Sequence, residues 1–278
     1  MFLATVLALA AAVLHAGWNL AAKRADGDRY MVLWAQFFAG GMISLPLLIG
    51  NQVLFGMAWQ GYALGLASGL IHLPYTWLLA RAYTLGDFSV SYPVARGGGA
   101  AVAAIGGVWF LGDHLTSWEV IGIAIVVLGL ALLAYGATGP NLAMALAVAA
   151  TIGCYTVVDA KGSRLTASVA YIFVTFVGAA LSNTCFALAT GRRADMIAML
   201  RHNWQCAAVT GAASLLTYGL VLVAVQHAPV GYVTALRESS VVLAALAGWK
   251  LLGEGDHRRR LTAALVVFAG LLTLVLGR

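Results

Sequence analysis

Long apolar segments fill almost the whole chain, and short polar connections separate them. Each segment is close to the roughly 20 residues with which an α-helix crosses the hydrocarbon core of a bilayer. Because hydrocarbon provides no hydrogen-bond partner for an open backbone, we expect every segment to be a helix. The ten segments cover residues 2–22, 30–50, 58–80, 88–111, 118–136, 141–158, 168–189, 204–225, 231–252 and 259–276. The sequence therefore predicts an all-α integral membrane protein with ten transmembrane helices.

The composition excludes an ordinary soluble domain. Charged residues make up 9% of the chain, whereas soluble domains average about 25%, so too few are present to cover a surface in water. The net charge of +6 comes from basic residues clustered in the connections. They do not form the basic stripe with interleaved aromatics that is typical of nucleic-acid binding. We therefore predict a multi-pass protein of a bacterial inner membrane, with the lipid bilayer and no nucleic acid among its partners.

The chain contains an internal repeat. Leu111-Gly112-Asp113 at the end of the fourth segment recurs as Leu252-Gly253-Glu254 at the end of the ninth, 141 residues later. Arg96 and Arg237 lie within the same two segments and are also 141 residues apart. Each copy of the repeat therefore places an arginine at the same depth of its segment.

The two copies divide the chain into a first repeat at 1–137 and a second at 141–278, with five predicted helices in each. Because five is an odd number, the second copy enters the membrane from the opposite side. Inverted copies are related by a pseudo-two-fold axis in the membrane plane and enclose the substrate site of many secondary transporters. We therefore predict two inverted five-helix repeats.

Arg96 and Arg237 are the strongest candidates for substrate contact. A charge at mid-bilayer costs from ~2.5 to over ~10 kcal/mol, depending on the assay, and it usually serves a function. The planar guanidinium suits a carboxylate, a phosphate or a phosphonate. The alternative is structural, with each arginine paired to a carboxylate or to carbonyls freed at a broken helix.

Glu238 follows Arg237 directly in the sequence. Neighbouring side chains on a regular helix point ~100° apart, so we expect these two not to neutralise each other. Glu238 is instead the candidate for proton coupling, because a carboxylate inside the membrane can titrate. His15 and His72 are further candidates for that role.

Other polar and aromatic side chains inside the segments are candidates to line a wet cavity around the arginines. Aromatic residues also serve as packing or as a lipid-facing belt, and a buried histidine can be held by a backbone partner. Their spacing shows no metal-ligand pattern and no catalytic arrangement, so we predict no metal, no other cofactor and no catalytic residues. The proposed lining residues are His15, Trp18, Asn19, His72, Tyr75, Tyr92, Tyr155 and Tyr232.

Glycine, proline and one aspartate add local expectations. The spacing Gly61-x-x-x-Gly65-x-x-x-Gly69 is typical of membrane helices that approach each other closely. Pro74 and Pro93 lie inside predicted segments and are expected to bend or interrupt them. Asp159 falls at the end of the predicted sixth helix, where we expect it to cap that helix or to pair with Lys161.

Several stretches carry a family resemblance. The stretch Leu9–Lys23, with Trp18 and Asn19 near its centre, resembles the first helix of EamA-type ten-helix members of the drug/metabolite transporter superfamily. Phe110–Thr116 resembles the acidic turn into the fifth helix of that family, and Leu251–Glu254 resembles the same turn in the second half. The resemblance spans the whole chain. It implies alternating-access transport of small metabolites, often export, with a pocket between the halves.

We accordingly predict a secondary active transporter, working as an exporter, of small anionic or zwitterionic metabolites such as amino acids, organic acids or phosphonates. The sequence carries no phosphate-binding loop of an ATPase, so a proton or a counter-solute would drive transport. The alternative is a membrane-embedded enzyme or scramblase that acts on lipid-linked substrates. The repeat favours a carrier, because an enzyme would gather its catalytic groups in one half near one surface.

The basic residues also predict an orientation. Eleven Lys and Arg residues fall in the connections after the first, third, seventh and ninth segments, against three after the sixth segment and at the C-terminus. Cytoplasmic connections carry the excess of positive charge, which places the larger group in the cytoplasm and both termini outside. The family resemblance implies the opposite, with cytoplasmic termini.

Overall fold

The structure is a computed structural model that describes residues 2–24, 28–112, 116–134, 139–166, 170–227, 233 and 236–276. Every regular element within these ranges is helical, which confirms the predicted all-α class. Tyr232, one of the proposed lining residues, lies outside the described residues.

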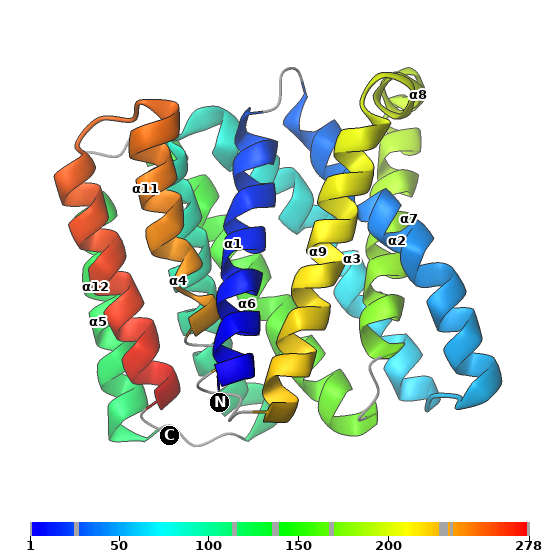
Figure 1. Ribbon diagram of the computed structural model, residues 1–278, viewed down its shortest axis with the longest axis horizontal. Coiled ribbons are helices and arrows are strands. Elements are labelled where there is room, and N and C mark those ends of the chain that lie inside the picture. The colour runs from blue at the N-terminus through cyan, green and yellow to red at the C-terminus, as the bar shows by residue number, and fades with distance from the viewer. Residues whose placement is uncertain are drawn as a thin grey trace.

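The helices run side by side, and the two ends of the chain lie at the same edge of the molecule, opposite α8 (Figure 1). In chain order they are α1 (Phe2–Arg24), α2 (Arg29–Leu54), α3 (Trp59–Leu85), α4 (Phe88–Gly106) with the π-helical turn η1 (Gly107–Leu111), α5 (Ser117–Ala134), α6 (Gly139–Thr166), α7 (Ala170–Ala189), α8 (Arg193–His202), α9 (Trp204–His227), α11 (Ser240–Leu252) and α12 (His257–Leu276). This order places each long helix antiparallel to the one before it.

Six of the described helices are long and apolar enough to cross a membrane, namely α1, α2, α3, α4 with η1, α6 and α7. Two further apolar helices, α5 and α11, are shorter. Large apolar side chains point outward from several of these helices, such as Val13 with 59% and Leu70 with 63% of its surface exposed. An outer surface of this kind is expected where lipid rather than water is the solvent.

Small residues let the helices pack at short distance. A methyl group added to Gly69 of α3 would lie 2.6 Å from the carbonyl carbon of Gly178 in α7. One added to Gly99 of α4 would lie 2.5 Å from Cγ2 of Ile152 in α6. Because no larger side chain has room at these positions, the expectation of close packing at Gly69 is confirmed.

Some predicted boundaries and breaks are wrong. The expected interruption at Pro74 and Pro93 does not occur, since α3 and α4 continue through them. A proline removes only one backbone donor, and neighbouring helices hold the chain in place. The bend expected as the other outcome stays a prediction. Helix α6 continues to Thr166, so Asp159 lies inside it and accepts a hydrogen bond from Tyr171 Oη at 2.8 Å. The short helix α8 was not predicted, since its polar sequence lacks an apolar run.

The predicted ninth segment is not one continuous helix. Its chain turns at Glu238 and Ser239, and α11 begins only at Ser240. The turn is closed by Ser239, whose backbone N and side-chain Oγ both donate to the carbonyl of Leu236, at 3.1 and 2.6 Å. A polar Arg-Glu-Ser-Ser run inside an apolar segment therefore marks a break that helical periodicity did not reveal.

The Leu111-Gly112 and Leu252-Gly253 steps end their helices in the same kind of turn. Gly112 and Gly253 have φ angles of 72° and 66°, in the left-handed region that glycine adopts without strain. Each donates its backbone N–H to a glycine carbonyl five residues earlier, Gly107 in the first copy and Gly248 in the second. The likeness between the copies therefore extends from sequence to backbone geometry at this position.

Candidate functional site

A buried carboxylate joins the two arginines that the repeat predicted. Glu238 is only 3% exposed, and its Oε1 accepts hydrogen bonds from Nη2 of Arg96 and, at 3.0 Å, from Nη2 of Arg237. Arg96 comes from α4 in the first half, whereas Arg237 and Glu238 come from the turn before α11 in the second half. An arginine from each half of the sequence thus meets the same oxygen atom.

The expectation that Arg237 and Glu238 would not neutralise each other is wrong. It assumed a regular helix, on which neighbouring side chains diverge. Because the backbone turns at Glu238 and Ser239, the two side chains approach each other and form an ion pair.

This ion cluster of Arg96, Arg237 and Glu238 retains unused hydrogen-bonding capacity. Among the residues that the structure describes, the buried Nε atoms of both arginines and the buried Oε2 of Glu238 find no hydrogen-bond partner. Two guanidiniums and one carboxylate also leave the cluster with a net charge of +1. A buried polar atom without a partner costs about 1–3 kcal/mol, and such an atom in a folded protein calls for an explanation, such as a ligand.

Aromatic residues of α1 and α4 lie next to each other near the cluster. The imidazole of His15 lies 5.1 Å from the ring of Trp18 and 6.1 Å from that of Tyr92, measured between ring centres. Tyr92 is one helical turn before Arg96, and the buried indole N–H of Trp18 meets no acceptor among the described residues. These residues combine apolar ring faces with a free donor, as a small-molecule site requires.

Asn19 differs from the proposed lining residues His15 and Trp18 of the same helix in how its side chain is bonded. Its Oδ1 accepts from the hydroxyl of Tyr83 at 2.6 Å, and its Nδ2 donates to the carbonyl of His15 at 2.8 Å. Both ends of the amide are therefore engaged within the protein, and Asn19 links α1 to α3.

A second aromatic group joins α3 to α6. His72 stacks on Tyr155 with ring centres 4.4 Å apart, and Tyr75 meets the same ring edge-on at 5.8 Å. The Nδ1 atom of His72 lies 2.8 Å from the carbonyl of Ser68, so a backbone group holds this histidine.

These contacts can be compared with known proteins. Residues 140–276 match the family model of the EamA-like transporters, which belong to the drug/metabolite transporter superfamily. The chain belongs to the EamA-like transporter family. No curated protein matches it by sequence. A protein of known crystal structure is 16% identical to this EamA-like chain with a TM-score of 0.65, and the match covers 98% of this chain and 96% of the other. At that identity the likeness concerns the fold alone.

The EamA-like chain also has an ion network at the opposite end of α4 from η1, on the edge where α8 lies. Glu254, the acidic residue of the second repeated turn, accepts from the backbone N–H of Phe88 at 2.6 Å and of Ser89 at 2.9 Å. Arg260 pairs with Asp87 at 2.6 Å and donates to Ser89 Oγ at 2.9 Å. A carboxylate at the first N–H groups of a helix is favourable, because those groups lack partners inside the helix.

Two further residues complete this end network. Lys23 at the end of α1 donates to the carbonyls of Tyr83 and Gly86 at the end of α3, at 2.6 and 2.5 Å. Gly248 leaves room for the carboxylate of Glu254 beside Ser89. A methyl group at this position would collide with Oε2 of Glu254 and would lie 2.6 Å from Cβ of Ser89. The network therefore holds the ends of α1, α3, α4, α11 and α12 together.

Sequence reasoning missed three aromatic residues near the predicted set. Phe37 lies 5.4 Å from the ring of His72 and 6.2 Å from that of Phe176, which in turn meets Tyr218 at 5.7 Å. The sequence could have identified Tyr218, because its phenol lies in the middle of an apolar segment. It could not have identified Phe37 and Phe176, because a phenylalanine in a membrane helix looks the same in the sequence whether it packs or lines a site.

Proposed function

We propose that this transporter of the drug/metabolite type exports small anionic or zwitterionic metabolites, such as amino acids, organic acids or phosphonates. The observation that carries the proposal is the buried ion cluster, with its net charge of +1 and its unpartnered Nε and Oε2 atoms. A carboxylate or phosphonate would accept from the free guanidinium N–H groups of Arg96 and Arg237. The amine of a zwitterion would donate to Oε2 of Glu238.

The proposal includes ten membrane helices in two inverted repeats, residues 1–137 and 141–278. In this proposal the first and third helices of the repeats are α1 and α3 in the first copy and α6 and α9 in the second. The packing supports it, because α1 packs on α9 just as α6 packs on α3. In addition, α2 packs on its counterpart α7, and α5 packs on its counterpart α12. The outer pair α5 and α12 and the twin glycine turns agree with the same symmetry (Figure 1). Repeats of this kind transport by rocking around a central site.

The same site couples substrate to movement in this proposal. Arg96 belongs to the first repeat, and Arg237 with Glu238 belongs to the second. A substrate anion that competes with Glu238 for the arginines therefore changes the contacts between the repeats. Protonation of Glu238 would weaken the same contacts, so a proton or a counter-solute can reset the carrier.

The orientation in a bacterial inner membrane follows from charge. The basic ends of the helices gather on one edge, where Arg24 bonds to the carbonyl of Leu251, Arg192 to Asp28 and Arg260 to Asp87. We place this edge in the cytoplasm and both termini outside. A C-terminal reporter active only outside the cytoplasm tests the assignment; activity of a reporter that works only in the cytoplasm contradicts it.

The substrate class is tested by thermal unfolding of the purified protein with a panel of carboxylates, phosphonates, amino acids and their neutral amides or esters. A ligand that binds only the folded state raises the melting temperature. We expect anionic and zwitterionic compounds to stabilise the protein and Arg237→Ala to abolish the effect. Stabilisation by neutral or cationic compounds alone would refute the proposed substrate class.

A further inference from the structure

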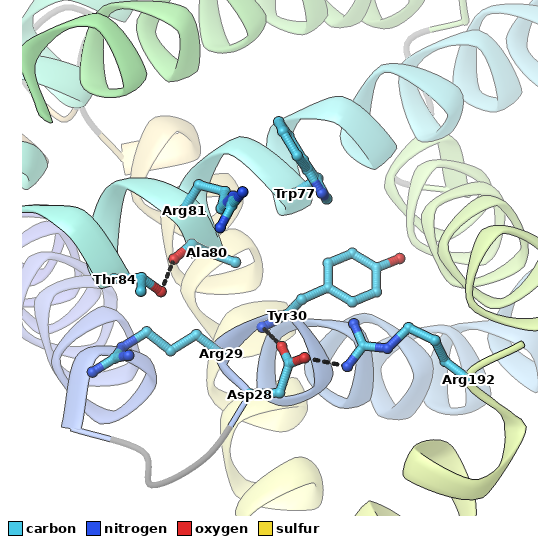
Figure 2. A pocket seen from close by; sticks show the side chains of 8 residues that line it. All are labelled: Asp28, Arg29, Tyr30, Trp77, Ala80, Arg81, Thr84 and Arg192. Atoms are coloured by element: carbon cyan, nitrogen blue, oxygen red, sulfur yellow. Dashed lines mark hydrogen bonds and ion pairs between the residues drawn. The ribbon is translucent and has the colours of Figure 1, made fainter. Parts of the chain in front are cut away.

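A pocket of about 340 Å³ lies away from the ion cluster, on the basic edge of the molecule. It is bounded by the start of α2, the end of α3 and the connection from α7 to α8 (Figure 2). A volume of this size is at the lower end of small-ligand sites, roughly 300–1,000 Å³. The side chains that matter for its chemistry are Asp28, Arg29, Tyr30, Trp77, Arg81 and Arg192.

One wall of the pocket is held together by its own charges. Asp28 caps α2 by accepting from the backbone N of Tyr30 at 2.8 Å, and it also bonds to the guanidinium of Arg192 (Figure 2). Arg192 pairs with Asp195 as well, at 3.1 Å, and lies over the ring of Tyr30 at 5.4 Å. The charge of Arg192 is therefore already matched within the protein.

The other two arginines of the pocket, Arg29 and Arg81, form no ion pair with a described carboxylate. Arg29 uses its Nε to bond the carbonyl of Lys23 at 3.3 Å. Arg81 lies over the ring of Trp77 at 5.6 Å. Among the residues that the structure describes, neither guanidinium has a carboxylate within 4.0 Å. The pocket therefore holds two positive charges without counter-ions.

The pocket lies at the end of a lipid-facing stripe. Leu66, Leu70 and Trp77 of α3 are 43%, 63% and 42% exposed, and they lead along one face of the helix toward Arg81. Tryptophan is favoured where a membrane helix meets the headgroup layer. Basic side chains at that depth attract anionic headgroups, each strengthening binding about fivefold.

We infer that this pocket binds a phosphate group, with Arg81 beside Trp77 as the ligand of its oxygens and Arg29, whose guanidinium lies on the far side of the pocket, as a second positive charge (Figure 2). An anionic phospholipid would place its headgroup in the pocket and its acyl chains along the Leu66–Leu70 stripe. A free phosphate compound offers the same oxygens without the chains. This site is separate from the Arg96–Glu238–Arg237 cluster and does not depend on the proposed transport function.

The test is lipid and phosphate binding by the purified full chain in a neutral detergent. Native mass spectrometry measures how much phosphatidylglycerol and phosphatidylcholine stay bound, and thermal unfolding measures stabilisation by inorganic phosphate. The variant is Arg29→Gln with Arg81→Gln. The matched control is Arg258→Gln, which removes an exposed arginine from α12, distant from α3 and α8 in the helix array (Figure 1). Arg81→Gln alone serves if the double variant does not fold, since that side chain has no ion pair to lose.

We expect phosphatidylglycerol to be retained over phosphatidylcholine, with roughly tenfold to thirtyfold weaker binding in the double variant and no change in the control. Stabilisation by inorganic phosphate that depends on the same arginines, without lipid selectivity, would assign the site to a soluble phosphate compound and supports the phosphate chemistry. Equal binding of both ligands in the parent and the double variant overturns the inference. So does an equal loss in Arg258→Gln, because it would indicate only diffuse surface charge.

Discussion

The ion cluster inside the molecule and the end network at its basic edge use the same chemical groups differently. In the end network both oxygens of Glu254 are engaged, Oε1 by the N–H of Phe88 and Oε2 by that of Ser89. In the ion cluster Oε1 of Glu238 accepts from both arginines, while Oε2 has no partner within the described part of the chain. A fully engaged carboxylate fixes its surroundings, whereas a half-engaged one keeps capacity for another molecule.

The two regions also differ in net charge, which is balanced in the end network and positive in the ion cluster. In the end network Arg260 pairs with both Asp87 and Glu254, and Lys23, which bonds to backbone carbonyls, supplies a second positive charge, so these four groups cancel. The ion cluster has two cations and one anion, which leaves +1. We therefore expect changes in the ion cluster to alter ligand binding, and changes in the end network to alter stability while binding is kept.

The largest effect is expected from Arg96→Ala and from Arg237→Ala. Each removes one donor to the substrate anion and leaves Glu238 with a single partner, and loss of a buried charged hydrogen bond costs about 2–5 kcal/mol. Transport in proteoliposomes should fall at least roughly thirtyfold, while the protein still inserts and purifies. Arg193→Ala, which removes an exposed arginine of α8, is the control. Near-normal transport in both variants would reduce the arginines to structural braces.

Glu238→Gln should have the next largest effect. The amide keeps the shape and one acceptor but removes the negative charge, so the ion cluster changes from +1 to +2. Zwitterions should bind roughly tenfold more weakly, and simple anions should be less affected because they need no acceptor. If Glu238 carries the coupled proton, the transport rate should also lose part of its dependence on pH. An unchanged pH profile would assign the proton to another group.

Glu254→Gln should have the opposite effect to the ion-cluster variants, lowering stability while substrate affinity is kept. The neutral amide loses the charge-assisted bonds to the start of α4, which should lower the free energy of unfolding by about 1–3 kcal/mol. The substrate affinity of the folded protein should stay within about twofold, because the ion cluster is untouched. Thermal unfolding and ligand titration on the same sample measure both quantities. A loss of affinity with unchanged stability would contradict the division between the regions.

The smallest effect is expected from Tyr83→Phe. It removes the bond from the tyrosine hydroxyl to Oδ1 of Asn19 and nothing else that the described contacts show. The free energy of unfolding should fall by about 1 kcal/mol, with transport retained. Tyr62→Phe in the exposed part of α3 provides the comparison, since its hydroxyl donates to Oε1 of Gln52 near the surface. Strong loss of transport in Tyr83→Phe would show that Asn19 and Tyr83 take part in binding.

Sequence reasoning identified Arg96 and Arg237 because an arginine inside an apolar segment stands out without knowledge of the fold. It did not find their contact, since residues 96 and 238 meet only when the two halves pack together. The bond between Arg237 and Glu238 was excluded for a local reason, an assumed regular helix, and a local turn made it possible. The acidic turn at Glu254 is visible as a sequence motif, but its bonds to Phe88 and Ser89 are contacts across 166 and 165 residues.

The sequence by itself determined that this chain is a bundle of helices for a membrane. That property is local, because an apolar segment without outside hydrogen-bond partners must satisfy its backbone within itself. Only the tertiary structure decided which buried polar atoms are engaged and which are left open. Such pairing depends on side chains that approach from distant segments to within about 3 Å, and a linear pattern of apolar and polar residues does not specify distances of that kind.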